Sequence, residues 1–174
     1  MTIGWAHLLL LAVAAQRGLE LLHARRNTAR LMARGGREAG RAHYPLLMLL
    51  HAGWLAALAL ATEPDPPVRW GWLTLFLALQ GLRVWAIASL GPYWTTRIVT
   101  LDDRPLRRRG PYRFMRHPNY AIVALEIPVL PLALGLPALA ALFGALNLLL
   151  LAHRIRVEER ALAPRRLARS PGGE

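Results

Sequence analysis

The chain has 174 residues, of which 55% are hydrophobic and 18% are charged, and its formal net charge is +12. A soluble domain of this length rarely combines such apolar content with so few charges, whereas a bundle of membrane-spanning helices needs it. The chain has no cysteine, and all 22 basic residues are arginines. The composition therefore excludes disulfides, thiolate metal sites, and cysteine or lysine nucleophiles, and its length predicts one domain.

Five apolar windows, each close to the roughly 20 residues that cross a bilayer, follow one another along the chain. They cover residues 3–23, 44–61, 70–90, 120–135 and 138–153. A tight Gly135-Leu136-Pro137 connection predicts that the last two form a helical hairpin, and Pro128 and Pro131 are expected to kink or break the fourth. The sequence thus predicts an all-α integral membrane protein with about five transmembrane helices, a single domain over residues 1–164 and a disordered tail over residues 165–174.

The arginines are distributed unevenly among the connections. All except Arg17, Arg69 and Arg83 lie between the first and second windows, between the third and fourth, or after the fifth. The positive-inside rule places such segments in the cytoplasm, which predicts an outer N-terminus and an inner C-terminus in a bacterial inner membrane. Because orientation accounts for the positive charge, no nucleic-acid partner is expected.

Ionisable residues inside apolar windows are energetically costly and are candidates for function. Arg17 and Glu20 are three residues apart, so they are predicted to pair on one helix face. Arg83 has the same spacing from Gln80 and is expected to extend its guanidinium to the cytoplasmic interface. Glu126 has no basic residue at i±3 or i±4, so it pairs with another helix, is protonated, or lines a polar cavity. The last alternative makes it a candidate substrate contact.

Other polar and aromatic residues give weaker signals. The six histidines show no helical metal-binding spacing such as H-E-x-x-H, so no metal site is predicted. Tryptophan and tyrosine residues near the ends of the windows, Trp54 and Tyr44 among them, are interpreted as interface anchors.

The strongest chemical signal lies at the two ends of the predicted hairpin. Residues 110–120 read G-P-Y-R-F-M-R-H-P-N-Y and enter the fourth window, and residues 154–162, which follow the fifth, read R-I-R-V-E-E-R-A-L. Both segments are therefore expected at the same membrane face. A carboxylate there can bind a ribose hydroxyl or an amino group, and an arginine can bind an anionic acceptor. The alternative is an orientation-setting loop in which Glu158 and Glu159 only neutralise nearby arginines.

These motifs, G-x-Y-x-x-x-R-H-P-x-Y followed by a helix pair and R-x-x-x-E-E-x-x-L, resemble the isoprenylcysteine carboxyl methyltransferase family over residues 104–162. The family consists of integral-membrane, S-adenosylmethionine-dependent methyltransferases. Residues 26–31, 34–38, 43–45 and 125–127 are similar to its bacterial branch associated with type III polyketide synthases, whose members methylate alkylresorcinol or alkylpyrone lipids. The resemblance implies an O-methyltransferase that uses S-adenosylmethionine and acts on a lipid-like acceptor, foremost a phenolic lipid, with a functional link to such a synthase.

The resemblance also implies a cofactor site within about residues 97–162. Its members are Arg104, Pro105, Leu106, Arg107, Tyr112, His117, Pro118, Asn119, Tyr120 and Glu158. Arg154, four residues before Glu158 and so on the same helix face, is implied to contact the acceptor and is a candidate catalytic residue. Two departures weaken the transfer of prenylcysteine specificity: the chain lacks the tyrosine-rich segment that follows the paired acids in eukaryotic members, and Arg97 stands where they have a glutamine.

The acid–base chemistry of the acceptor gives one further candidate. A carboxylate is already nucleophilic at neutral pH, whereas a phenol with a pKa near 10 benefits from a base or a nearby cation. His43, together with Glu38, is the candidate for that role, and the alternative for His43 is an interfacial residue beside Tyr44. Three other functions stay open: carboxyl methylation of an isoprenylcysteine-like acceptor, an NADPH-dependent membrane reductase with a similar hairpin, and a non-enzymatic membrane scaffold.

Overall fold

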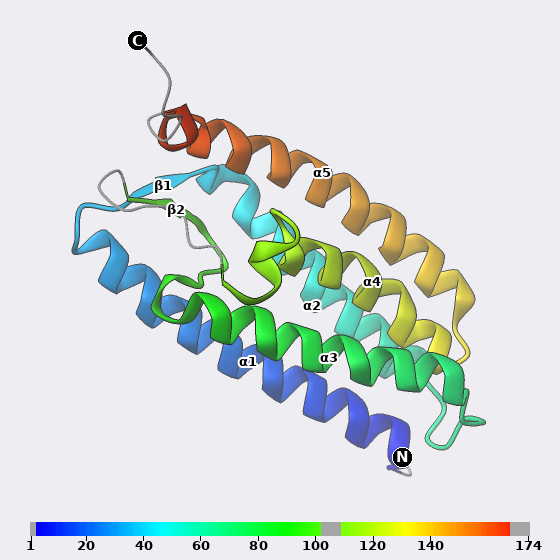
Figure 1. Cartoon of the computed structure of the whole chain (residues 1–174). Helices are drawn as coiled ribbons and strands as arrows, with labels where there is room; N and C mark the ends of the chain where they lie inside the picture. The colour runs from blue at the N-terminus through cyan, green and yellow to red at the C-terminus, as the bar shows by residue number, and fades with distance from the viewer. Residues whose placement is uncertain (1–2, 102–108, 168–174) are drawn as a thin grey trace.

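The structure is a computed structural model that describes residues 3–101 and 109–167, with the backbone alone for residues 164–167. In these ranges five α-helices run alternately in opposite directions along one elongated bundle (Figure 1). They are α1 (Trp5–Met32), α2 (Tyr44–Ala61), α3 (Trp70–Leu90), α4 (Pro118–Ala133) and α5 (Pro137–Leu167).

Four of the described helices, α1, α2, α3 and α5, are long and apolar enough to cross a membrane. The fifth, α4, has 16 residues. At 1.5 Å per residue it measures about 24 Å, which is less than the roughly 30 Å of hydrocarbon in a bilayer. The structure therefore has four candidate spans and one shorter apolar helix, where the sequence predicts about five spans.

The helix boundaries agree with the apolar windows for α2 and α3, α4 is shifted by two residues from its window, and α1 and α5 extend beyond theirs. Helices α2 and α3 begin and end with their windows, but α1 continues to Met32 and α5 to Leu167. A window measures the apolar length, whereas arginine and alanine continue a helix well beyond it. Helix α5 thus includes the first residues of the predicted tail, and residues 168–174 lie outside the described part of the chain.

A small antiparallel sheet departs from the all-α prediction. Strand β1 (Arg37–Ala39) pairs with β2 (Ile98–Thr100), with Arg37 opposite Thr100. Strands of three residues are too short to show a period-2 pattern in the sequence. The sheet joins the connection between α1 and α2 to the segment that follows α3, so it fixes the loops at one end of the bundle.

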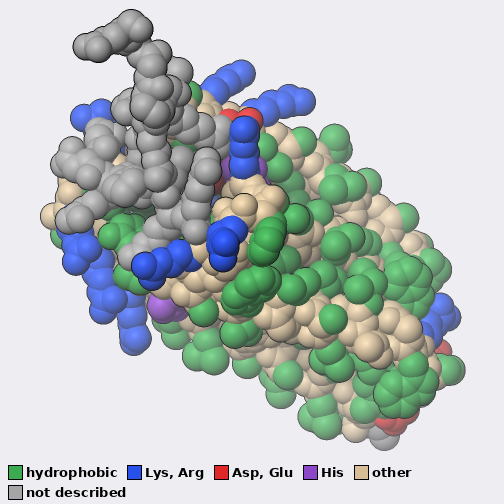
Figure 2. All heavy atoms as spheres, in the orientation of Figure 1, with side chains coloured by type: hydrophobic (Ala, Val, Ile, Leu, Met, Phe, Trp, Pro, Cys, Tyr) green, Lys and Arg blue, Asp and Glu red, His purple; other side chains and the backbone are tan. Residues whose placement is uncertain are grey.

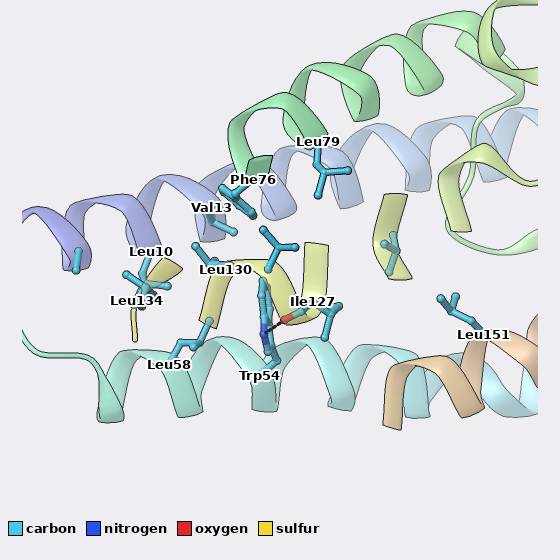
Figure 3. Packing of buried hydrophobic residues seen from close by; sticks show 13 residues of the cluster. Leu10, Val13, Trp54, Leu58, Phe76, Leu79, Ile127, Leu130, Leu134 and Leu151 are labelled. Carbon is cyan, nitrogen blue, oxygen red and sulfur yellow. Dashed lines mark hydrogen bonds between the residues drawn. The ribbon is translucent and has the colours of Figure 1, made fainter. Parts of the chain in front are cut away.

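Helix α4 is continuous despite Pro128 and Pro131. Pro131 lacks the N–H that would otherwise bond to the carbonyl of Ile127, four residues earlier. The indole Nε1 of Trp54, on α2, donates to that carbonyl at 3.1 Å instead (Figure 3). Trp54 is only 1% exposed, so its interpretation as an interface anchor is wrong. A carbonyl freed in this way within an apolar interior needs such a partner from a neighbouring helix.

The two ends of the bundle differ in charge. The connection between α1 and α2, the described segments that follow α3 and precede α4, and the end of α5 meet at one end (Figure 1). The N-terminus, the connection between α2 and α3, and the turn between α4 and α5 lie at the other. On the face shown in Figure 2, arginine side chains gather at the first end and hydrophobic side chains cover the flank. Large apolar residues such as Leu49, Leu60 and Leu149 are exposed there or on other flanks. This distribution matches a bundle surrounded by lipid.

Candidate functional site

Tyr120, in the first turn of α4, connects the two ends of the hairpin. Its hydroxyl donates to Glu158 Oε2 and accepts from Arg154 Nε at 2.9 Å. Arg154 and Glu158 are one turn apart on α5, so one face of this helix presents a cation and a carboxylate to the same phenol. The prediction that the two motifs meet is confirmed. We call His117, Tyr120, Arg154 and Glu158 the Tyr120 cluster.

Arg154 is buried, with 3% of its surface exposed. Its Nη2 donates to the backbone carbonyl of Thr96, and its guanidinium carbon lies 5.6 Å from the centroid of the Tyr120 ring. Within the described residues, the hydrogen-bond partners of this guanidinium are a phenol oxygen and a carbonyl oxygen, both neutral. A buried cation without a direct carboxylate partner favours binding of an anion or of an oxygen that develops negative charge.

His117 completes the cluster from the segment before α4. Its ring stacks on Tyr120 with centroids 5.4 Å apart and planes at 17°. Its Nδ1 lies 3.8 Å from Glu158 Oε1, and its Nε2 lies 3.6 Å from Glu159 Oε1. Two buried atoms, His117 Nε2 and Asn119 Oδ1, have no hydrogen-bond partner in the part of the chain that the structure describes. Such atoms require a partner, and a bound ligand can supply it.

Proline and glycine explain why the chain adopts this local geometry. Pro118 is the first residue of α4, where its missing N–H costs nothing and its fixed φ starts the helix. Gly110 has φ +54°, and a Cβ there would collide with Ser89 on α3. It begins a short 3-10 helix, Gly110–Arg113, that carries Tyr112. Burial, together with the Glu158 carboxylate, raises the pKa of Tyr112 above the usual range, so its hydroxyl keeps a proton to donate.

One group of predicted cofactor residues lies in a part of the chain that the structure does not describe. Arg104, Pro105, Leu106 and Arg107 lie outside the described residues.

A cavity of about 310 Å³ lies beside the Tyr120 cluster, with walls from all five helices and from residues 94–96. This volume is at the lower end of the roughly 300–1,000 Å³ typical of small-molecule sites. Its polar lining includes Arg17, Glu20, His51, Arg83, Asn119 and Arg154. Leu21, Leu47 and Leu55 contribute to the apolar lining. The cavity therefore offers apolar walls and polar groups to one ligand, and Arg154 belongs both to it and to the Tyr120 cluster.

A second set of charged side chains lies deeper in the bundle, and its members form ion pairs with one another. Glu126, 2% exposed, accepts from Arg17 Nη2 at 3.0 Å, from Arg83 Nη1 at 3.0 Å and from Gln80 Nε2 at 2.8 Å. Glu20 accepts two bonds from Arg83, at 2.7 and 2.8 Å, and pairs with Arg17 at 2.9 Å. These five residues, the central charge cluster, balance two guanidiniums against two carboxylates across α1, α3 and α4.

The central charge cluster decides three predictions. The pairing of Arg17 with Glu20 is confirmed. Arg83 does not extend to the interface: it is 6% exposed, because carboxylates from two other helices compensate its charge inside the bundle. Of the alternatives for Glu126, the structure supports pairing with other helices. Arg17, Glu20 and Arg83 line the cavity, and Glu126 lies behind them.

The candidates from the first arginine-rich connection lie beside the cavity and not in its walls. The His43 ring contacts that of His153 edge to face, with centroids 5.3 Å apart and planes at 82°. Glu38 accepts from Arg97 Nη1 at 2.7 Å, and the Arg97 guanidinium lies 4.5 Å from the Tyr44 ring centroid. The cavity walls formed by the described residues include neither His43 nor Glu38.

Two site residues were missed by the sequence reasoning. Thr96 contributes a backbone carbonyl to Arg154, which no side-chain pattern could have indicated. His51 lines the cavity, but in the sequence it is one histidine among six and shares no spacing with another polar group.

The comparisons with known proteins give one family and two relatives. The family model described as "Isoprenylcysteine carboxyl methyltransferase (ICMT) family" matches residues 72–164, more than half of the chain. The chain is 37% identical to an uncharacterized protein, YpbQ, of Bacillus subtilis (strain 168), over 159 residues that cover 89% of this chain and 95% of the relative. It is 29% identical to an uncharacterized protein of Haemophilus influenzae over 149 residues, 79% of this chain and 83% of that protein. No solved structure matches the chain.

Proposed function

The chain belongs to the isoprenylcysteine carboxyl methyltransferase family, and from this premise we propose that it is an S-adenosylmethionine-dependent membrane O-methyltransferase for a lipophilic acceptor. One observation carries the proposal. The Tyr120 hydroxyl holds a carboxylate on one side and a guanidinium on the other, next to a cavity with apolar walls. The carboxylate and the cation are therefore fixed in place while both retain capacity for a ligand.

The residues of the Tyr120 cluster fit S-adenosylmethionine, which supplies an electrophilic methyl group on a sulfonium. Glu158 can accept from a ribose hydroxyl or an amino group, and the stacked rings of His117 and Tyr120 offer faces to adenine or to a cation. His117 Nε2 and Asn119 Oδ1, which have no hydrogen-bond partner among the described residues, provide further bonding capacity. We assign Tyr112 and Pro118 to the same site, and by resemblance also Arg104, Pro105, Leu106 and Arg107.

Arg154 is assigned to the acceptor. Its charge is not directly neutralised by a carboxylate of the described residues, so it can bind an acceptor oxygen and stabilise negative charge there. The cavity walls suit an oxygen-bearing ring attached to an apolar chain. We therefore place a polyketide-derived phenolic lipid first, supplied by a type III polyketide synthase. The unneutralised guanidinium also suits a carboxylate, so an isoprenylcysteine-like acceptor is the second candidate.

The position of the cluster supports a site at the inner face of the membrane. The start of α4 and the end of α5, which carry the cluster's residues, lie at one end of the bundle (Figure 1), and arginine side chains gather there (Figure 2). The positive-inside rule favours a cytoplasmic location for that end, with the N-terminus outside. A site at the inner face of a bacterial inner membrane receives a water-soluble donor from the cytosol and a lipid-like acceptor from the bilayer. Exclusion of water and orientation of the two reactants supply the acceleration.

The test measures transfer of labelled methyl from S-adenosylmethionine into organic-extractable lipid by membranes that contain the protein. Glu158→Gln is expected to abolish most of the transfer, and Glu63→Gln, at the opposite end of the bundle, is the matched control. Label that resists mild base indicates a methyl ether and a phenolic acceptor, whereas label released as methanol indicates a methyl ester. No label from a broad acceptor panel, together with no cofactor binding, would refute the proposal, and NADPH binding would then favour the reductase.

A further inference from the structure

The cavity contains one histidine that the Tyr120 cluster does not use. His51, two turns into α2, lines the cavity together with Asn119 and Arg154. Its Nδ1 lies 2.9 Å from the carbonyl oxygen of Leu47. A carbonyl can only accept, so Nδ1 carries the hydrogen and donates it. In the neutral ring the other nitrogen, Nε2, is then a hydrogen-bond and proton acceptor.

The charged residues around His51 do not occupy its accepting nitrogen. Arg17 and Glu20 on α1, Arg83 on α3 and Arg154 on α5 line the cavity with it. Arg17 and Arg83 are compensated within the central charge cluster, and no described residue bonds to His51 Nε2. The cavity thus contains one guanidinium without a carboxylate partner and one imidazole with an accepting nitrogen.

We propose that His51 is a catalytic residue that accepts the hydroxyl proton of the acceptor during methyl transfer, an inference that rests on the proposed function. A lone pair of the acceptor oxygen forms the new O–C bond, the C–S bond breaks with its electron pair left on sulfur, and the hydroxyl proton moves to Nε2. The positive charge lost from sulfur reappears on the imidazolium, so the net charge of the site does not change. The proton then returns to water.

The division of labour follows from the chemistry of the two side chains. Arg154 is always protonated and cannot take a proton, so it stabilises the oxygen and leaves deprotonation to another group. A hydroxyl acceptor needs that second group, whereas a carboxylate acceptor does not. His43, the candidate from the sequence, lies eight residues earlier, just before α2, and its ring contacts that of His153. The two histidines are therefore rival proton acceptors that one experiment can separate.

The first test compares methyl transfer to an alkylphenol and to a carboxylic acid with the same alkyl chain. His51→Gln is expected to lower phenol methylation on the order of 100-fold and to remove the ascending limb of its pH profile, with carboxylate methylation nearly unchanged. His7→Gln, on α1 near the opposite end of the bundle, is the matched control. Transfer to phenol that survives in His51→Gln, or is lost in His43→Gln instead, overturns this inference alone. No transfer by the wild type to either acceptor overturns the proposed function.

The second test does not depend on turnover. The probe is an alkylated 4-nitrophenol, whose phenolate absorbs visible light while the phenol does not, bound to the purified protein without cofactor. If His51 accepts its proton, the bound probe ionises at a lower pH in the wild type than in His51→Gln. Equal ionisation of the bound probe in the two proteins would overturn the inference, because Arg154 would then be sufficient.

Discussion

The central charge cluster and the Tyr120 cluster lie within the same bundle and differ in whether their opposite charges are in direct contact. In the first, two guanidiniums and two carboxylates are in direct contact at 2.7–3.0 Å. In the second, the Tyr120 hydroxyl separates Arg154 from Glu158. Each cluster has a buried amide oxygen without a described hydrogen-bond partner in or beside it, Gln80 Oε1 in the first and Asn119 Oδ1 in the second, so the contrast lies in the charges. A saturated set fixes helices relative to one another, whereas an unsaturated set has capacity for a ligand. We therefore expect the first cluster to support the fold and the second to bind a ligand.

The largest expected effect is a loss of protein stability when the central charge cluster is disrupted. Glu126→Ala leaves Arg17 and Arg83 with one carboxylate between them, and breaking a buried ion pair in this way costs about 3–5 kcal/mol. The measurement is thermal or denaturant unfolding of the purified protein in detergent. We expect the variant to lose most of its folded fraction at temperatures where the wild type is intact.

A charge-balanced double variant serves as the control for that loss. Arg83→Met with Glu126→Met leaves the neutral Arg17–Glu20 pair, so it is expected to recover a large part of the stability that Glu126→Ala loses. A double variant no more stable than Glu126→Ala would mean that the cluster does not act through charge balance.

The next effect is on ligand binding at the Tyr120 cluster. Glu158→Gln removes the carboxylate proposed to bind S-adenosylmethionine, and a lost hydrogen bond to a charged group costs about 1.5–3 kcal/mol, or roughly 10-fold to 150-fold in affinity. Stability is expected to change little, since Glu158 is partly exposed, with 24% of its side chain accessible. Equilibrium dialysis with labelled cofactor measures the affinity. A loss of stability without a loss of affinity would place Glu158 with the structural charges.

A smaller effect is expected from the group that separates the two charges. Tyr120→Phe keeps the ring stacked on His117 but removes the hydroxyl that holds Arg154 and Glu158. Methyl transfer is expected to fall about 10-fold, equivalent to about 1.4 kcal/mol, while the fold is retained. Steady-state kinetics with the protein in lipid nanodiscs provides the check, and activity within twofold of the wild type would show that the bridge is dispensable.

The smallest effect is expected at the periphery. Glu38 pairs with Arg97, whose side chain is 33% exposed, and solvent and salt screen such a pair. Glu38→Gln should therefore change stability by less than about 1 kcal/mol, with a smaller difference at high salt. Unfolding measured at two ionic strengths tests this, and a loss as large as that of Glu126→Ala would mean that exposure does not separate the two kinds of charge.

The sequence predicted the helices well because apolar length and charge placement act locally. The windows gave α2 and α3 to the residue, and the spacing of Arg154 and Glu158 predicted their common face. The continuity of α4 could not be predicted, because it depends on Trp54, which lies 73 residues away from the carbonyl that it bonds. The β1–β2 sheet likewise joins two segments far apart in the chain.

The residues of the candidate site likewise differ in whether local sequence was enough to identify them. Motif residues such as Tyr120 and His117 were identified because they lie close together in the sequence and resemble a family pattern. Arg83 was assigned to the interface because its partners, Glu20 and Glu126, lie 63 and 43 residues away. The role of His51 depends on which helices enclose the cavity, and that is a property of the fold alone.

The measurement that tests the central claim most directly is binding of labelled S-adenosylmethionine to three purified proteins: the wild type, Glu158→Gln, and the double variant Arg83→Met with Glu126→Met. If the unsaturated cluster binds the cofactor and the saturated cluster only supports the fold, Glu158→Gln loses affinity by at least about 10-fold while the folded double variant binds like the wild type. Wild-type affinity in Glu158→Gln, together with lost binding in a folded double variant, would contradict the account.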